Sequence, residues 1–146
     1  MTREERRRKE RWLRRYRDGL AEERRLRGEM REVRERLAST SAALDGMPRA
    51  SGRDRLACGM DKLAQYQQEI EATIAEIIEV RCETERAIGA LPDIMQRNVL
   101  RARYLEGMSW DKVARSLHIS ERTAYYTRDA ALERLEIPKT EVDEDD

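Results

Sequence analysis

The chain has 146 residues, of which 41% are charged, 39% are hydrophobic and 5% are aromatic, and phenylalanine is absent. This composition favours helix and supplies few large apolar side chains for a globular core. No stretch is apolar enough to span a membrane or to serve as a secretory signal, so we expect a cytoplasmic protein without membrane contact.

The 30 basic and 30 acidic residues cancel overall but are unevenly distributed along the chain. Residues 1–36 carry an excess of basic side chains, and residues 137–146 carry an excess of acidic ones. Residues 93–136 are close to balance. This asymmetry indicates separate roles for the segments, and the balance over residues 93–136 argues against purely electrostatic nucleic-acid binding there.

Residues 3–38 are predicted to form one long helix, which Gly19 or Gly28 could interrupt. Its Arg-rich start admits two interpretations: an arm that binds nucleic acid, or a solvated helix with Glu–Arg pairs four residues apart. We favour the solvated helix. Apolar residues recur along one face at spacings typical of a helix that packs on another helix, namely Trp12, Tyr16, Leu26, Met30, Val33 and Leu37.

Residues 39–54 contain Gly, Pro, Ser and Asp, which predict a loop. A second helix is predicted from about Arg55 to Ile88. Together the two helices predict an antiparallel hairpin over residues 1–90, whose apolar stripes are buried on each other or in a homodimer. The stripe of the second helix consists of Leu56, Met60, Leu63, Tyr66 or Gln67, Ile70, Ile74, Ile77 and Ile78.

Residues 91–137 are predicted to form a separate domain of three short helices, at about 92–105, 110–117 and 121–135. Ser109 and Ser120 are the expected N-caps of the last two helices. His118 is expected in the turn between them, because His tolerates a positive φ better than most residues. The acidic residues 138–146 are predicted to be a disordered tail. The expected fold class is therefore all-α, with a long antiparallel helical hairpin followed by a three-helix helix-turn-helix domain.

The spacing of the last two helices is that of a helix-turn-helix motif. The inward row is expected to hold Val113, Leu117, Ile119, Ala124, Thr127, Ala131, Leu132 and Leu135. The helical period places Glu121, Arg122, Tyr125, Tyr126 and Asp129 on the outward face. Such a helix enters the major groove by its N-terminal end. An alternative is that the two tyrosines pack at a protein interface or cover a small core. The further DNA-binding candidates are Ser120, Thr123, Arg128, Lys112, Arg115 and Arg101.

The segment LPDIMQRNVLRARYLEGMSWDKVARSLHISERTAYYTRDAALERL resembles region 4 of sigma-70-type factors. The resemblance lies in Leu-Pro, Arg-Tyr-Leu-Glu-Gly, Ser-Trp, Val-Ala, Leu-x-Ile-Ser and Ala-Leu-x-x-Leu. It implies binding to a −35 promoter element through the last helices, with Glu121, Arg122, Tyr125 and Tyr126 at the positions of the family's base-reading residues. The whole layout is similar to small phage and mobile-element regulators of the ArpU and RinA groups.

We therefore expect a sequence-specific DNA-binding transcription regulator that contacts double-stranded promoter or operator DNA. RNA polymerase is a candidate partner, and the hairpin is a candidate homodimer interface. Two alternatives are a small terminase-like DNA-packaging subunit and a coiled-coil protein–protein adaptor. An enzyme is not expected, because no cluster of acid, base, nucleophile or metal ligands is visible in the sequence. His118, Cys58 and Cys82 lack the spacing of a metal site, so no metal or cofactor is expected. The two cysteines are interpreted as small hydrophobic residues.

Overall fold

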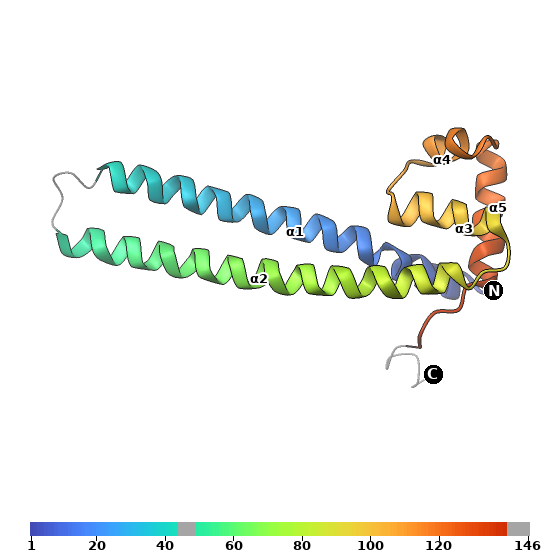
Figure 1. Ribbon diagram of the computed structural model, residues 1–146, viewed down its shortest axis with the longest axis horizontal. Helices are drawn as coiled ribbons and strands as arrows, with labels where there is room; N and C mark the ends of the chain where they lie inside the picture. The colour runs from blue at the N-terminus through green and yellow to red at the C-terminus, as the bar shows by residue number, and fades with distance from the viewer. Residues whose placement is uncertain (44–48, 140–146) are drawn as a thin grey trace. The chain divides into compact units, whose positions relative to one another are not determined.

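The structure is a computed structural model that describes residues 1–43 and 49–139, and every regular element in those ranges is helical (Figure 1). The predicted all-α fold, with a long helix pair followed by shorter helices, is confirmed. Within these ranges no helix combines the length and the apolar character needed to cross a membrane. The elements are α1 (Arg3–Ala43), α2 (Arg49–Gly89), α3 (Ile94–Leu100), the π-helix η1 (Arg101–Leu105), α4 (Trp110–Leu117) and α5 (Glu121–Arg134).

The long helices extend further than the sequence predicts. The predicted loop over residues 39–54 is wrong in extent, since α1 continues to Ala43 and α2 begins at Arg49. The part of that prediction on residues 44–48 lies outside the described residues. α1 also runs through Gly19 and Gly28 without a break. Because each added residue of an established helix gains a hydrogen bond, a packed helix propagates through residues of weak helix propensity.

The chain divides into two compact units. The hairpin unit is Gly19–Ile77, and the C-terminal unit joins Met1–Asp18 to the chain from Ile78 onward. This division differs from the predicted one at residue 90. The difference arises because the start of α1 and the end of α2 supply core residues to the short helices, including Leu13 and Ile88.

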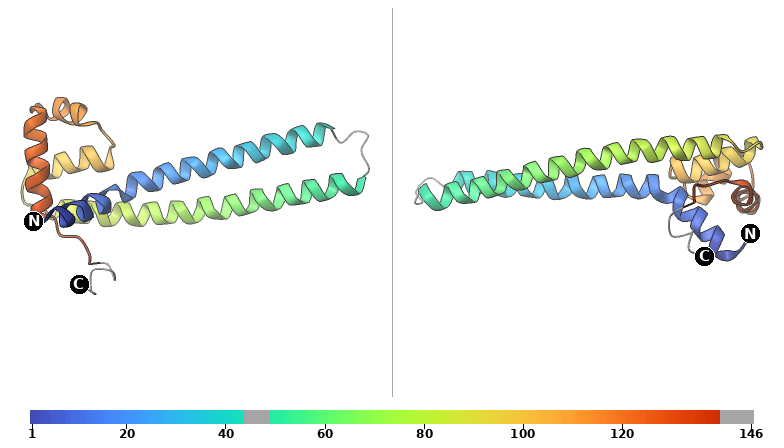
Figure 2. Two further views of the ribbon diagram at one scale, coloured as in Figure 1. Left: turned by 180° about the vertical axis from the view of Figure 1, so that it is seen from behind. Right: turned by 90° about the horizontal axis from the view of Figure 1, so that it is seen from below.

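The hairpin unit consists of the antiparallel segments of α1 and α2 between Gly19 and Ile77, which Figures 1 and 2 show side by side. Its buried core is Leu26, Met30 and Ile70, flanked by half-buried Leu63, Tyr66 and Ile74. A Cβ at position 19 would lie 2.8 Å from Cγ1 of Ile77, so glycine permits the close approach of the two helices there.

The predicted stripe of α2 is only partly buried. Leu56, Met60 and Ile78 are exposed, and so are Cys58 and Cys82, the two cysteines interpreted from the sequence as small hydrophobic residues. A strict heptad stripe covers little area on one partner helix, which leaves residues at its margins in solvent.

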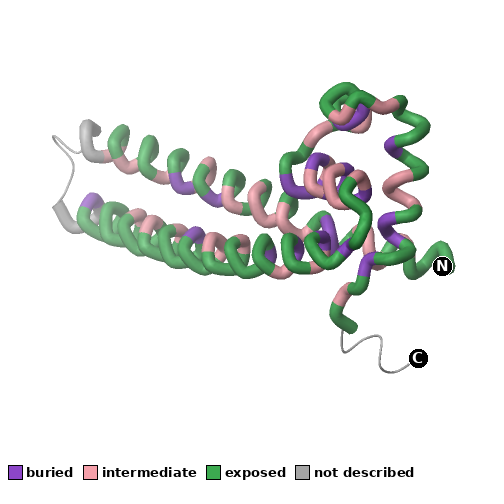
Figure 3. Tube along the Cα trace, turned by 45° about the vertical axis from the view of Figure 1, so that its right-hand side comes forward, coloured by how far each residue is buried: buried purple, intermediate pink, exposed green. Residues whose placement is uncertain are grey.

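The C-terminal unit has two groups of buried residues, which Figure 3 shows distributed among its helices. The first group brings α1, the end of α2, α3, η1 and α5 together, and the second brings α3, η1, α4 and α5 together. The first contains Trp12, Leu13, Ile88, Leu91, Leu100, Tyr104, Leu105, Ala131, Leu132 and Leu135. The second contains Val99, Ala102, Val113 and Ala124, with Met95, Met108, Trp110, Leu117 and Ile119 packed against them.

The start of α3 differs by two residues from the predicted helix. Asp93 is the N-cap and its Oδ1 accepts a hydrogen bond of 2.9 Å from the backbone N–H of Gln96. Pro92 therefore precedes the cap instead of occupying the first turn. An Asp side chain is a strong N-cap because it satisfies a backbone donor that the helix itself leaves unpaired.

Gly28 in α1 and Gly107 in the turn between η1 and α4 give a matched pair of stability predictions. Gly107 has φ +71°, and a Cβ there would also meet the Arg17 guanidinium, whereas Gly28 is helical with open space around it. Gly107→Ala is expected to lower the free energy of unfolding by about 1–2 kcal/mol, because an L side chain is strained in the left-handed region. Gly28→Ala is expected to raise it by about 0.5–1 kcal/mol through reduced backbone entropy of the unfolded chain.

Urea denaturation followed by circular dichroism measures both changes. Equal effects of the two substitutions would contradict the assignment of Gly107 to a left-handed turn and of Gly28 to a regular helix.

Candidate nucleic-acid interface

The connection between α4 and α5 is built from local side-chain and backbone hydrogen bonds. Ser109 and Ser120 are the N-caps, and their hydroxyls accept from the backbone N–H groups of Lys112 and Thr123. Both predicted caps are thereby confirmed. His118 adopts φ 56° and ψ 42°, as its place in the turn predicts. These contacts fix where α4 ends and α5 begins.

The α5 helix separates an inward row from an outward face. Ala124, Ala131, Leu132 and Leu135 are buried as predicted, and Thr127 is half-buried. Five predicted residues at the N-terminal end of α5 are exposed, and we call them together the α5 surface: the N-cap Ser120, then Glu121, Arg122 and Thr123, and Tyr126 one turn after Arg122.

Arg122 and Tyr126 form a pair on the α5 surface. The Arg122 guanidinium lies 5.6 Å from the centre of the Tyr126 ring, and its Nη2 donates to the Tyr126 hydroxyl at 3.3 Å. Tyr126 is 62% exposed. The contact orders the long Arg122 side chain while leaving most of the five guanidinium donors open to a ligand.

Tyr125 has a different environment from its neighbour Tyr126. Its ring centre lies 5.0 Å from that of Trp110, and the Arg128 guanidinium lies 5.1 Å from both rings. Arg103 approaches the Trp110 ring as well, at 5.2 Å. This stack joins α4 to α5, since aromatic and cation–π contacts of this kind favour association of the two helices.

Three of the predicted site residues, Arg128, Asp129 and Arg101, are only partly exposed. Arg128 is only 16% exposed in its side chain because it is held in the stack, and it donates to Asp129. The Asp129 carboxylate also accepts from Arg6 Nη2 at 2.7 Å. Arg101 is half-buried, and its Nη2 lies 4.0 Å from the position of a Cβ on Gly89 at the end of α2.

Two predicted basic residues on α4 remain exposed. Lys112 and Arg115 both lie in solvent. Arg115 Nη2 pairs with Asp111 Oδ2 at 2.6 Å in an i,i+4 arrangement, which offsets part of its charge. Lys112 is thus the more available of the two for an anionic ligand.

Sequence reasoning missed the contribution of α1 to this region. Besides Arg6, Lys9 contacts α5: its Nζ donates to the carbonyl oxygen of Leu132 at 2.7 Å. The spacing of Arg6, Lys9, Leu13 and Tyr16 is a signal that places them on one helix face, but two of these residues are charged and do not register in a search for apolar stripes.

The buried core of the C-terminal unit contains a tyrosine, Tyr104, whose pKa is shifted. Burial raises the pKa of the Tyr104 phenol, so this side chain is neutral in the core of the C-terminal unit. Within the described part of the chain, no group of three or more His, Cys, Asp or Glu side chains is arranged to hold a metal ion.

The fold and this surface define an all-helical protein with a long helix pair and a short-helix unit that exposes the start of its last helix. The chain belongs to the family described as "Protein of unknown function (DUF1492)", whose model matches residues 59–136, more than half of the chain. No curated protein matches the chain. No solved structure matches it either.

Proposed function

We propose that this protein is a sequence-specific DNA-binding transcription regulator that reads the major groove of double-stranded DNA with α5. The observation that carries the proposal is the exposed α5 surface, on which Arg122 and Tyr126 stand at the start of a capped helix. The major groove admits an α-helix, and Arg is the side chain that most often reads guanine there. The resemblance to sigma-70 region 4 supports the same role.

The proposal divides the contacts into two kinds. Arg122, Glu121 and Tyr126 are assigned to base edges, where Glu accepts from cytosine and the Tyr ring contacts a thymine methyl group. Ser120, Thr123, Lys112 and Arg115 are assigned to the sugar–phosphate backbone, which sets the register of α5 on the duplex. Tyr125, Arg128 and Asp129 are assigned to holding α5 in place, because their side chains contact Trp110, each other or Arg6.

The wider setting belongs to the same proposal. We infer a cytoplasmic regulator of phage or mobile-element origin that cooperates with RNA polymerase, without catalytic activity or a cofactor. Homodimerisation through the hairpin unit is included, since Leu56 and Met60 expose apolar area one helical turn apart on α2.

Selection of bound duplexes from a random pool, with the molar mass of the protein–DNA complex measured by light scattering, tests the proposal. We expect one enriched motif next to a promoter-like element, bound by a monomer or dimer. A large ring that binds without such a motif would favour a terminase-like packaging subunit instead. If no duplex is enriched and no DNA is bound at physiological salt, the proposal is wrong and a protein–protein adaptor is favoured.

A further inference from the structure

The start of α1 is attached to the C-terminal half of α5 by two polar contacts. Arg6 Nη2 lies 2.7 Å from Asp129 Oδ1, and Lys9 Nζ donates to the Leu132 carbonyl oxygen at 2.7 Å. A lysine at this place also compensates the negative end of the α5 dipole. A shallow hollow lies between the two helices and is lined by Met1, Thr2, Arg3, Arg6, Asp129, Ala130 and Glu133.

These contacts divide the outward face of α5 into two halves. The N-terminal half is the α5 surface and is open, whereas the C-terminal half, at Asp129 and Glu133, adjoins the first turns of α1. Without α1 this half would present two carboxylates beside any duplex bound to α5, and these would repel its phosphates. Arg6 neutralises Asp129 by direct pairing.

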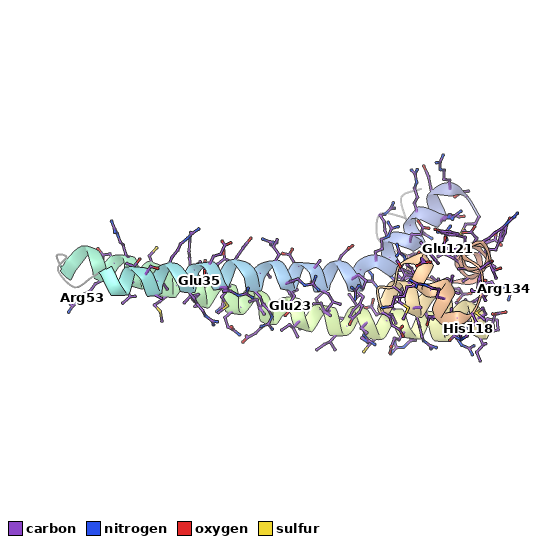
Figure 4. All side chains as sticks on the ribbon, turned by 90° about the horizontal axis from the view of Figure 1, so that it is seen from above. Glu23, Glu35, Arg53, His118, Glu121 and Arg134 are labelled. Atoms are coloured by element: carbon purple, nitrogen blue, oxygen red, sulfur yellow. The ribbon has the colours of Figure 1, made fainter. Side chains whose placement is uncertain are left out.

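The same turns of α1 carry basic side chains that are available to a ligand. Arg3 and Arg7 are exposed, and across residues 1–43 and 49–139 neither forms an ion pair. They are four residues apart and therefore share a helix face. Figure 4 shows the side chains at the start of α1 extending outward from the helix.

Arg3 lies beside the part of α5 that follows the α5 surface, and Arg7 lies one turn further along the same face of α1. Arg3 lines the hollow at Ala130, and Ala130 is one helical turn beyond Tyr126, a rise of about 6 Å along α5. An arginine side chain is long enough to span this distance, so Arg3 can reach a phosphate at the edge of a groove that holds α5. A phosphate at that edge is the anion that such guanidinium groups recognise by paired hydrogen bonds.

We propose that the start of α1 is a second DNA-contacting element, in which Arg3 and Arg7 bind phosphates that border the groove occupied by α5. This inference rests on the proposed function. The family model begins at residue 59, so α1 lies outside the matched region. The proposed phosphate contacts of α1 therefore rest on the structure of this chain and not on the family. The ion pair and the lysine contact hold the element in a fixed position, so its binding costs less conformational entropy than that of a free arm.

The experiment measures how duplex affinity of the full chain depends on salt concentration for wild type, Arg3→Gln/Arg7→Gln and Arg24→Gln/Arg34→Gln. The last variant is the matched control, because it removes two exposed α1 arginines of the hairpin unit. Each phosphate contact contributes about 0.9 to the slope of log affinity against log salt. The Arg3/Arg7 variant is therefore expected to bind with a slope shallower by nearly two, and the control with the wild-type slope.

A second readout separates phosphate contacts from base contacts. The Arg3/Arg7 variant is expected to lose affinity by the same factor for the selected duplex and for an unrelated duplex of equal length. If wild type binds duplexes but the Arg3/Arg7 variant has the same slope as wild type, the inference is overturned while the proposed function stands. The same loss of slope in both variants also overturns it, because the effect would then come from total charge. Absence of duplex binding by wild type refutes the proposed function and this inference together.

Discussion

Arg122→Ala is expected to weaken binding to the selected duplex by a factor between about fivefold and 150-fold, the range of one good bidentate contact to a base. The side chain lies on the α5 surface, and its hydrogen bond and its ring contact are both with Tyr126 on the same helix. Its removal therefore leaves the core unchanged. The loss of affinity would come from the DNA interface alone.

The measurement is fluorescence anisotropy with the selected duplex and with duplexes changed at single positions. The variant is expected to lose preference at one base pair and to keep it elsewhere. Arg134→Ala, on the last turn of the same helix, is the control and is expected to bind as wild type. Tyr126→Ala should reproduce part of the loss, since it removes the ring that orders Arg122. A uniform loss over all duplexes would reassign Arg122 to a phosphate contact.

Leu13→Ala is expected to lower the free energy of unfolding by about 2–5 kcal/mol, the cost of a large cavity in a packed core. Leu13 is fully buried in the group that includes Leu100 and Leu132, so the cavity would open between α1 and α5. Because α1 and α5 are also joined by Arg6 and Lys9, hydrogen exchange of the α5 amides is expected to accelerate as well.

Met60→Ala is the control for this substitution. Met60 is 58% exposed, so its truncation is expected to change the free energy of unfolding little. Urea denaturation gives the stability of both variants. A cost for Leu13→Ala as small as that for Met60→Ala would show that the start of α1 is not part of the C-terminal core.

The features that the sequence predicted well depend on neighbouring residues. Ser109, Ser120 and His118 act through hydrogen bonds and backbone angles within a few residues, and all three have the predicted roles. The all-α fold followed from composition and helical spacing in the same way. Local chemistry of this kind is visible in a single sequence, because the partners lie close together in the chain.

The features that the sequence did not predict depend on residues far apart. Arg6 and Asp129 are separated by 123 positions, and nothing in the spacing of either helix indicates that they meet. Asp129 satisfied the helical period of an outward face, and Arg128 was a candidate phosphate contact, yet tertiary contacts engage both. The loop was predicted too long for a related reason, since packing of a paired helix outweighs the weak propensity of individual residues.

The packing of the first turns of α1 against α5, within one compact unit, has a consequence for biosynthesis. The hairpin unit, Gly19–Ile77, is contiguous and can fold as soon as it has left the ribosome. Leu13 and Trp12 emerge earlier still, but their partners on α5 are translated only after both long helices. The apolar side chains of Trp12 and Leu13 therefore stay without these partners until α5 has been translated, and we expect nascent chains stalled before α5 to need a chaperone.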